Sequence, residues 1–169
     1  MSRKAEWLEF IDSPGRRRLP PLLRRAWYGL NRAFRRRIAH ISLTPDQYTV
    51  LRTLLEHEGV SQRRLTSLMS SDPNTVASVL ERMEKAGLIE RQTQEQDHRA
   101  NRLRVKASGR TKYEKGREIA VALQGEILSA LPSNAREEFL ANLDRIADAC
   151  QASALSSPQR RTRVKRSPA

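Results

Sequence analysis

The sequence of 169 residues has a single cysteine, Cys150, and its aromatic residues make up only 5% of the chain. One cysteine cannot form a disulfide within the chain, which is typical of proteins from a reducing compartment. No apolar run approaches the ~20 residues that span a bilayer. The N-terminal residues include Glu6, Glu9 and Asp12 and do not resemble a secretory signal. We therefore expect a soluble, cytoplasmic protein with no membrane-bound part.

Motifs of enzymes and metal centres are also missing. The three histidines, His40, His57 and His98, are scattered along the sequence. Together with one cysteine they offer no metal-ligand spacing. There is no glycine-rich phosphate loop and no nucleophile elbow. We expect no catalytic residues, no cofactor and no bound metal.

Positive charge is what the sequence has in excess. It holds 32 Lys and Arg against 19 Asp and Glu, which gives a net charge of +13. Nucleic acid is the first candidate partner for such a chain, and an anionic membrane surface is the second. Binding to a polyanion releases counterions, so affinity should fall steeply with salt. The apolar fraction of 38% is low, which favours a small core, an extended shape or a core completed by a partner chain.

A basic amphipathic helix is predicted after the prolines at positions 20 and 21. Its apolar residues recur at helical spacing and form a stripe that must be buried, for which a partner subunit is a natural choice. The arginines of its other faces fit a solvated surface and a DNA-facing surface about equally well. The stripe comprises Leu23, Trp27, Leu30, Phe34, Ile38 and Ile41.

Three shorter helices follow, each with a residue suited to cap its N-terminus. Thr44 precedes a helix that Gly59 is expected to end, and Ser61 precedes a short helix over residues 62–69. The turn at 70–72 precedes Pro73, which opens a helix to about residue 86. Gly87 then fits a left-handed C-cap.

The hydrophobic period then changes from 3.6 to 2 residues. Residues 88–92 and 101–105 are predicted to be the two strands of a hairpin, with a polar turn over 93–100. A hairpin directly after a helix-turn-helix is a wing. The predicted fold class is therefore mainly α with a small β-hairpin wing, a winged helix-turn-helix with helices on both sides.

The C-terminal part should contain two more helices. Ser108 is expected to cap a helix that runs to about residue 130, and Pro132 separates it from the last one. We assign residues 1–18 to a flexible arm, 19–42 to an N-terminal helix, 43–107 to the winged helix-turn-helix, 108–155 to C-terminal helices and 156–169 to a disordered basic tail.

The helix from Pro73 carries the candidate DNA-reading surface. Its core face is predicted from four apolar residues at helical spacing, and the opposite face presents Asn74, Thr75, Ser78 and Arg82. Short polar side chains near a helix N-terminus can reach base edges in a major groove. An ordinary solvated face would show the same residues, but the position of this helix within the series favours DNA.

The hairpin tip carries a second set of candidate contacts. Arg99 could enter a narrow minor groove, where the negative potential is strongest. Asp97 could orient it through a charge-assisted hydrogen bond. Asn101 and Arg102 lie beside them and complete the candidate set.

Three segments resemble the MarR family of transcriptional regulators: residues 43–48 (LTPDQY), 85–91 (KAGLIER) and above all 97–103 (DHRANRL). The resemblance covers about residues 19–152. It implies a homodimer held together by the N-terminal helix and the last two helices. It also implies that Pro73 opens the recognition helix and that Arg99 is the minor-groove arginine, with Asp97 as its buried support. Members similar to SlyA have an arginine where this chain has Ser78, so base preference cannot be transferred.

The resemblance also suggests regulation. Family members often bind phenolic or other lipophilic anions between the dimerisation and DNA-binding regions, and Arg24, Trp27 and Tyr48 stand at suitable places. Such residues are more often part of a core or interface. Other members sense oxidants through a cysteine of the first helix. Cys150 lies near the end of the last helix instead, so we expect a buried, inert thiol.

We therefore expect a dimeric regulator, most often a repressor in this family, that recognises a pseudo-palindromic operator in double-stranded DNA. A small-molecule effector is an optional partner. One alternative is a sequence-independent nucleic-acid-binding or chromosome-organising protein that uses its basic ends. The other is a protein-interaction module that has lost DNA binding.

Overall fold

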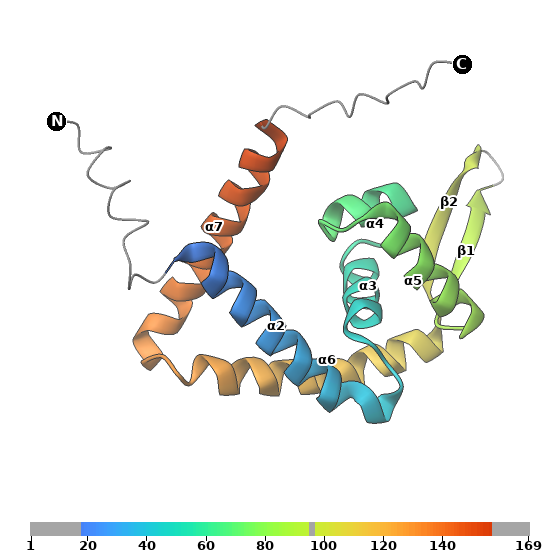
Figure 1. Cartoon of the computed structure of the whole chain (residues 1–169). Helices are drawn as coiled ribbons and strands as arrows, with labels where there is room; N and C mark the ends of the chain where they lie inside the picture. Colours follow the sequence, from blue (N-terminus) through green and yellow to red (C-terminus); the bar gives the residue numbers. More distant parts are fainter. Residues whose placement is uncertain (1–17, 95–96, 157–169) are drawn as a thin grey trace, which may run out of the picture. The chain divides into compact units, whose positions relative to one another are not determined.

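A computed structural model describes residues 18–94 and 97–156, without the side chains of residues 93–101. Almost all of the expected arm and tail thus lies outside the described residues. The chain divides into two compact units, of which one ends at Gln124 and the other begins at Gly125. The described elements are helices and one antiparallel hairpin, β1–β2 (Figure 1). The predicted fold class is confirmed.

The first described helix, α2, covers Leu19–Ile38, and one 3₁₀ turn, η1 (Ala39–Ile41), follows it. The predicted apolar stripe is divided along its length. Phe34 and Ile38 are buried, whereas the side chains of Trp27 and Leu30 are 58% and 47% exposed. The C-terminal half of the stripe therefore belongs to the core of this chain, and Trp27 and Leu30 of its N-terminal half are exposed in the described part of the chain.

Helix α3 covers Pro45–Glu56 and begins with the predicted cap. The Thr44 hydroxyl oxygen accepts from the Gln47 backbone N–H at 3.2 Å, and the Gln47 side chain accepts from the Thr44 N–H at 3.0 Å. This reciprocal capping box satisfies two N–H groups that a helix start leaves unpaired. Helix α3 packs against α2, α4, α5 and β2 and so stands at the centre of the first unit.

The helix-turn-helix consists of α4 (Gln62–Leu68) and α5 (Pro73–Lys85), capped by Ser61 and Asp72 as predicted. Gly87 ends α5 in the left-handed region, with a φ of 67°. Its N–H donates to the Glu84 carbonyl, and the Leu88 N–H donates to the Met83 carbonyl. These two bonds form a Schellman motif that directs the chain from α5 into the hairpin.

The hairpin is longer than the sequence pattern indicates. Strand β1 covers Ile89–Gln94 and β2 covers Asp97–Val105, with an irregularity in the pairing at residues 93 and 94. The expected turn over 93–100 is therefore wrong, because residues 97–100 belong to β2. Backbone pairing alone can hold two strands together. The sequence of the outer part of this hairpin is polar and lacks the alternation of apolar and polar residues by which a half-buried strand is predicted.

The prediction that Ser108 caps the next helix is also wrong. Helix α6 covers Ala107–Leu128, so Ser108 is inside its first turn. The Ser108 hydroxyl donates to the Gly87 carbonyl at 2.6 Å. This bond joins the start of α6 to the end of α5 across the base of the hairpin.

The core of the first unit contains apolar side chains from every helix of that unit and from both strands. Within the described part of the chain, no polar or charged residue is buried. Four residues of α5 face this core, as their helical spacing predicts. They are Val76, Val79, Leu80 and Met83.

The second unit contains the end of α6, the 3₁₀ turn η2 (Ser133–Ala135) and helix α7 (Arg136–Ser156). None of the α7 residues is buried, and the Phe139 and Leu143 side chains are exposed. Cys150 is exposed as well. The expectation of a buried thiol is therefore wrong for the single chain, because no residue of α7 is buried among the described residues.

Candidate nucleic-acid interface

The outer face of α5 presents the four residues predicted to read DNA. Asn74, Thr75, Ser78 and Arg82 are all exposed, opposite the four buried residues of the same helix. The helix is thus anchored by one face and offers short hydrogen-bonding groups on the other. Such a face is suited to the donor and acceptor pattern of a major groove.

Asp72 fixes the first turn of this helix. One of its carboxylate oxygens accepts from the Thr75 backbone N–H at 2.8 Å and from the Thr75 hydroxyl at 3.0 Å. These hydrogen bonds lower the pKa of Asp72 below its ordinary value of 3.8. The Thr75 hydroxyl donates its proton within the helix, so toward a base it can act only as an acceptor.

Acid should therefore loosen the N-terminus of α5. Because the pKa of Asp72 is lower in the folded chain than in the unfolded chain, its stabilising effect is present above the unfolded value of 3.8. The effect is lost as the pH falls through the lower folded value. Asp72→Asn retains a good capping residue that does not ionise.

We expect the thermal midpoint of the wild type to fall more than that of Asp72→Asn between pH 5 and about pH 2. Thermal unfolding followed by circular dichroism at several pH values measures this difference. Parallel curves for the two proteins would contradict the assignment of the cap charge.

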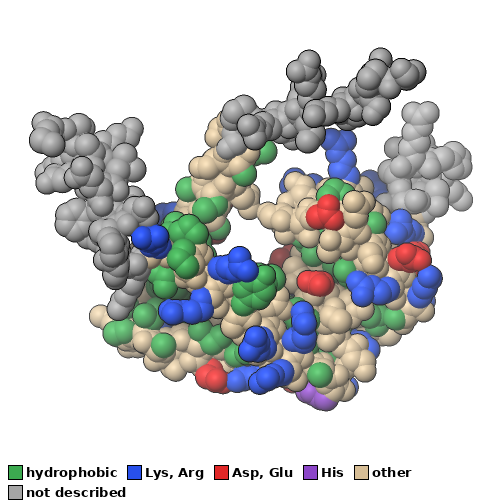
Figure 2. Space-filling view, viewed as in Figure 1, with side chains coloured by type: hydrophobic (Ala, Val, Ile, Leu, Met, Phe, Trp, Pro, Cys, Tyr) green, Lys and Arg blue, Asp and Glu red, His purple; other side chains and the backbone are tan. Residues whose placement is uncertain are grey.

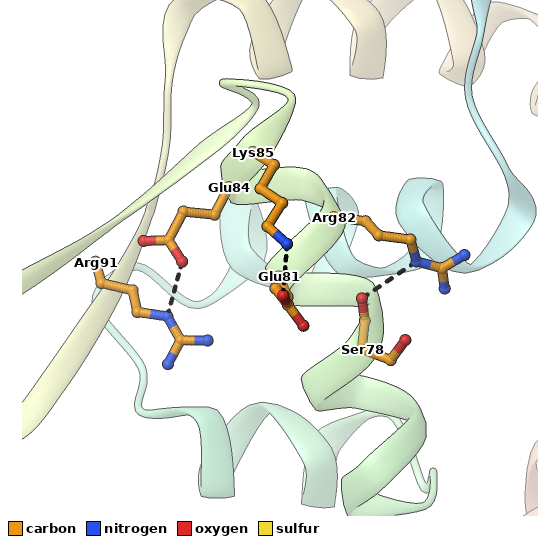
Figure 3. A network of polar contacts seen from close by, with 6 residues as sticks. All are labelled: Ser78, Glu81, Arg82, Glu84, Lys85 and Arg91. Carbon is orange, nitrogen blue, oxygen red and sulfur yellow. Dashed lines mark hydrogen bonds and ion pairs between the residues drawn. The ribbon is translucent and has the colours of Figure 1, made fainter.

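The C-terminal half of α5 carries two acidic residues that are paired with cations (Figure 3). Glu81 accepts from Lys85 at 2.7 Å, and Glu84 accepts from Arg91 of β1 at 3.2 Å. The Arg82 Nε donates to the Ser78 carbonyl one turn earlier at 3.2 Å, which lays the side chain along the helix. Carboxylates that would repel phosphate are thus offset, and the Glu84–Arg91 pair also ties α5 to the wing.

The base of the wing is joined to the connection between α3 and α4. Arg102 forms an isolated bridge with Ser61, and the Leu103 N–H donates to the Val60 carbonyl at 3.2 Å. The exposed Arg102 side chain lies against Gly59, which has a φ of 69°. The structure therefore places Arg102 within the paired part of the hairpin, opposite Gln92, and not at its tip.

The other wing candidates, Asp97, Arg99 and Asn101, belong to β2 by their backbone. Their side chains lie outside the described part of the structure. Their contacts with DNA, and the support of Arg99 by Asp97, remain predictions.

A hollow of about 280 Å³ lies beside the first turn of α5, and the sequence did not single out its residues. It is lined by Gln62, Arg63, Thr66 and Pro73. Arg63 is exposed there and could contact a phosphate close to a groove occupied by α5. Only the packing of α4 on α5 brings these residues together, so spacing along one helix could not reveal them.

The three residues predicted for an effector pocket have different surroundings. Tyr48 is buried, where its ring centroid lies 5.0 Å from that of Phe34 and 5.6 Å from that of Tyr113. This burial raises the pKa of Tyr48. Trp27 packs edge-on against Tyr28, and the Arg24 guanidinium lies 5.4 Å from the Tyr28 ring centroid. Within the described residues, no hydrogen bond or ring contact joins Arg24 or Trp27 to Tyr48.

Another cavity, of about 210 Å³, lies where the end of α3, the base of the hairpin and the start of α6 meet. Its lining includes Glu58, Glu90, Arg104 and Arg110. Glu58 accepts from Arg110 at 3.2 Å across this cavity. The predicted effector residues are not among those that line it.

The described residues contain no cluster of three or more His, Cys, Asp or Glu side chains that could bind a metal ion. None of the helices in this part of the chain is long and apolar enough to cross a membrane.

Comparison with known proteins identifies relatives of the central region. The model of the MarR family matches residues 43–100. The regulator HosA of Escherichia coli is 30% identical over 98 residues, which are 58% of this chain and 73% of HosA. The HTH-type transcriptional regulator TtmR of Methylorubrum extorquens is 36% identical over 74 residues, 44% of this chain and 38% of TtmR. The match therefore spans less than half of TtmR.

Solved structures extend the similarity beyond this region. CouR, a transcriptional repressor solved with a 23-mer DNA duplex, is 25% identical with a TM-score of 0.69, over 75% of this chain and 89% of CouR. MepR of S. aureus, solved with DNA, has a TM-score of 0.73 at 21% identity, over 79% of this chain and 99% of MepR. The second similarity concerns the fold alone.

Proposed function

The chain belongs to the MarR family of winged helix-turn-helix transcriptional regulators, and on that premise we propose that it is a homodimer that binds a pseudo-palindromic operator and represses transcription. In each subunit α5 enters a major groove and the wing reaches the adjacent minor groove. The family is one of regulators and not of enzymes.

One observation carries the DNA-binding part of this proposal. The exposed N-terminal half of α5 has no acidic residue after its cap, while the acidic residues farther along the helix are paired with Lys85 and Arg91. A phosphate backbone therefore meets hydrogen-bonding groups and cations on this face. Asn74, Ser78 and Arg82 are proposed to contact base edges or phosphates, with Thr75 as an acceptor. Arg99, Asn101 and Arg102 are proposed as wing contacts.

Exposed apolar surface supports the dimer. The side chains of Trp27 and Leu30 on α2 and of Phe139 and Leu143 on α7 are 36–58% exposed. Leaving this much apolar area in water is unfavourable, and a second subunit would cover it. Residues 19–42 and 108–155 are therefore proposed as the dimerisation segments on either side of the DNA-binding domain.

We also propose that a small-molecule effector regulates DNA binding. An exposed aromatic pair, Trp27 and Tyr28, stands beside the Arg24 cation. An aryl carboxylate could use both features, since it needs an apolar surface for its ring and a cation for its charge. Its binding to helices of the dimer would alter the spacing of the two α5 helices and so lower operator affinity.

Selection from a pool of random duplexes tests the proposed function. We expect the enriched sequences to contain two inverted half-sites whose centres lie about one helical turn, ~34 Å, apart, because two α5 helices related by a two-fold axis enter successive major grooves. Sequencing of the bound fraction after several rounds measures this. A pool that stays random would favour the sequence-independent alternative, and no retention of DNA would favour a protein-interaction module.

A further inference from the structure

Helix α2 carries a line of arginines on the side opposite its buried residues. Arg25, Arg32 and Arg36 stand at i, i+7 and i+11, which at 3.6 residues per turn places them within about 40° of one another. Phe34 and Ile38, which enter the core, lie on the other side of the same helix. We call Arg25, Arg32 and Arg36 the arginine stripe.

The charge of this stripe is not offset nearby. The sequence has no Asp or Glu between Asp12 and Asp46. Among the described residues, Arg25, Arg32 and Arg36 are exposed and form no ion pair, in contrast to Arg52, which pairs with Glu56 at 2.8 Å. In Figure 2, Lys and Arg side chains outnumber acidic ones on the face that carries α2. Guanidinium groups held close together repel one another, so a polyanion is the partner that fits them.

The packing of α2 argues against a membrane as that polyanion. A helix that lies in a membrane surface places its apolar face in the acyl region. On α2 the C-terminal half of that face, with Phe34 and Ile38, is already buried in the chain's own core. The arginines could touch lipid headgroups only with the apolar face turned away, which removes the larger part of the binding free energy.

We propose that the arginine stripe binds the phosphate backbone of duplex DNA outside the operator, as a second and sequence-independent DNA contact. The eleven residue steps from Arg25 to Arg36 extend over about 17 Å of helix. Over that length a duplex presents roughly ten phosphate charges. This inference rests on the proposed function in one respect, namely that the protein binds DNA. The flanks of the bound duplex and a second duplex present the same phosphate chemistry, and the experiment distinguishes these two sources.

The test replaces Arg25, Arg32 and Arg36 together by glutamine. A matched control removes three positive charges from the exposed surface of α6 and α7 through Lys115→Gln, Arg117→Gln and Arg145→Gln. The affinities of the wild type and both variants are measured over a salt series for two duplexes. One contains only the operator, and the other is about 200 base pairs long without an operator. Because all six positions lie in the proposed dimerisation segments, thermal midpoints and size-exclusion chromatography establish first that all three proteins are folded and have the same oligomeric state.

For the long duplex we expect the slope of log affinity against log salt to fall by about 2–3 per chain in the stripe variant, since each lost phosphate contact removes about 0.9. The control variant and the short operator should change little. Capture of a second labelled duplex by operator-bound wild type, lost in the stripe variant, would assign the contact to a second duplex. Weaker binding of the stripe variant to the long duplex, with no capture of a second duplex by the wild type, would assign the contact to the same duplex.

Three results would overturn the inference. An unchanged salt slope would mean that the stripe is a solvated face, and an equal loss in the control would mean that only net charge matters. Loss of binding to phosphatidylserine vesicles, with DNA binding unchanged, would identify the partner as a membrane. If the wild type shows no operator preference, the proposed function fails, yet the salt slope on the long duplex still reports on the stripe.

Discussion

The double variant Asn74→Ala, Arg99→Ala is expected to bind its operator at least about 10³-fold more weakly than the wild type. Asn74 is exposed in the first turn of α5, and Arg99 is the arginine that the family resemblance assigns to the minor groove. Each good base contact contributes about 1–3 kcal/mol, and a dimer loses each contact twice. Titration of labelled operator at one fixed salt concentration, followed by fluorescence anisotropy, measures the loss.

A matched control for this pair is Asn134→Ala, Arg117→Ala. It removes the same residue types from exposed positions in η2 and α6, outside the DNA-binding domain. With its oligomeric state shown by size-exclusion chromatography to equal that of the wild type, it should bind the operator as the wild type does. Normal operator binding by Asn74→Ala, Arg99→Ala would show that α5 and the wing are not the reading surface.

Gly109→Ala is expected to lower the free energy of unfolding by about 2 kcal/mol, the upper end of the usual overpacking cost less the gain in helix propensity. A Cβ at this position would collide with the Leu88 carbonyl oxygen and would lie 2.9 Å from a Val105 methyl group. Backbone must then move, and overpacking of this kind typically costs about 1–3 kcal/mol or more. The gain in helix propensity from glycine to alanine, about 1 kcal/mol, offsets only part of this cost. Urea unfolding measures the difference.

Gly29→Ala is the control, because nothing lies within 4 Å of the position that its Cβ would occupy on α2. It should stabilise the chain by about 0.5–1 kcal/mol through helix propensity alone. A Gly109→Ala chain as stable as the wild type would contradict the close packing of α6 on the base of the wing.

Features set by neighbouring residues could be predicted from the sequence. The caps at Thr44, Ser61 and Asp72 and the left-handed Gly87 each depend on contacts within a few residues. The inward face of α5 follows from helical spacing in the same way. For this reason the order of the helices, the hairpin and the outward position of Asn74 and Ser78 all agree with the sequence-based expectation.

Features set by distant residues could not be predicted. Ser108 resembles a helix cap, but its hydroxyl bonds to Gly87, which lies 21 positions earlier. The need for glycine at position 109 comes from Leu88 and Val105, which only the folded hairpin brings near. Arg91 pairs with Glu84 across a helix end, where neither the helical nor the strand period applies. Burial of Tyr48 beside Tyr113 likewise depends on the packing of α6 against α3.

The measurement that tests the central claim most directly is a competition between the selected operator and a scrambled duplex of the same length and composition, at one stated salt concentration. A regulator that reads bases through α5 and the wing should prefer its operator by at least ~10³-fold. Equal affinity for the two duplexes, with the same salt dependence, would contradict the account, since charge alone would then explain all of the binding.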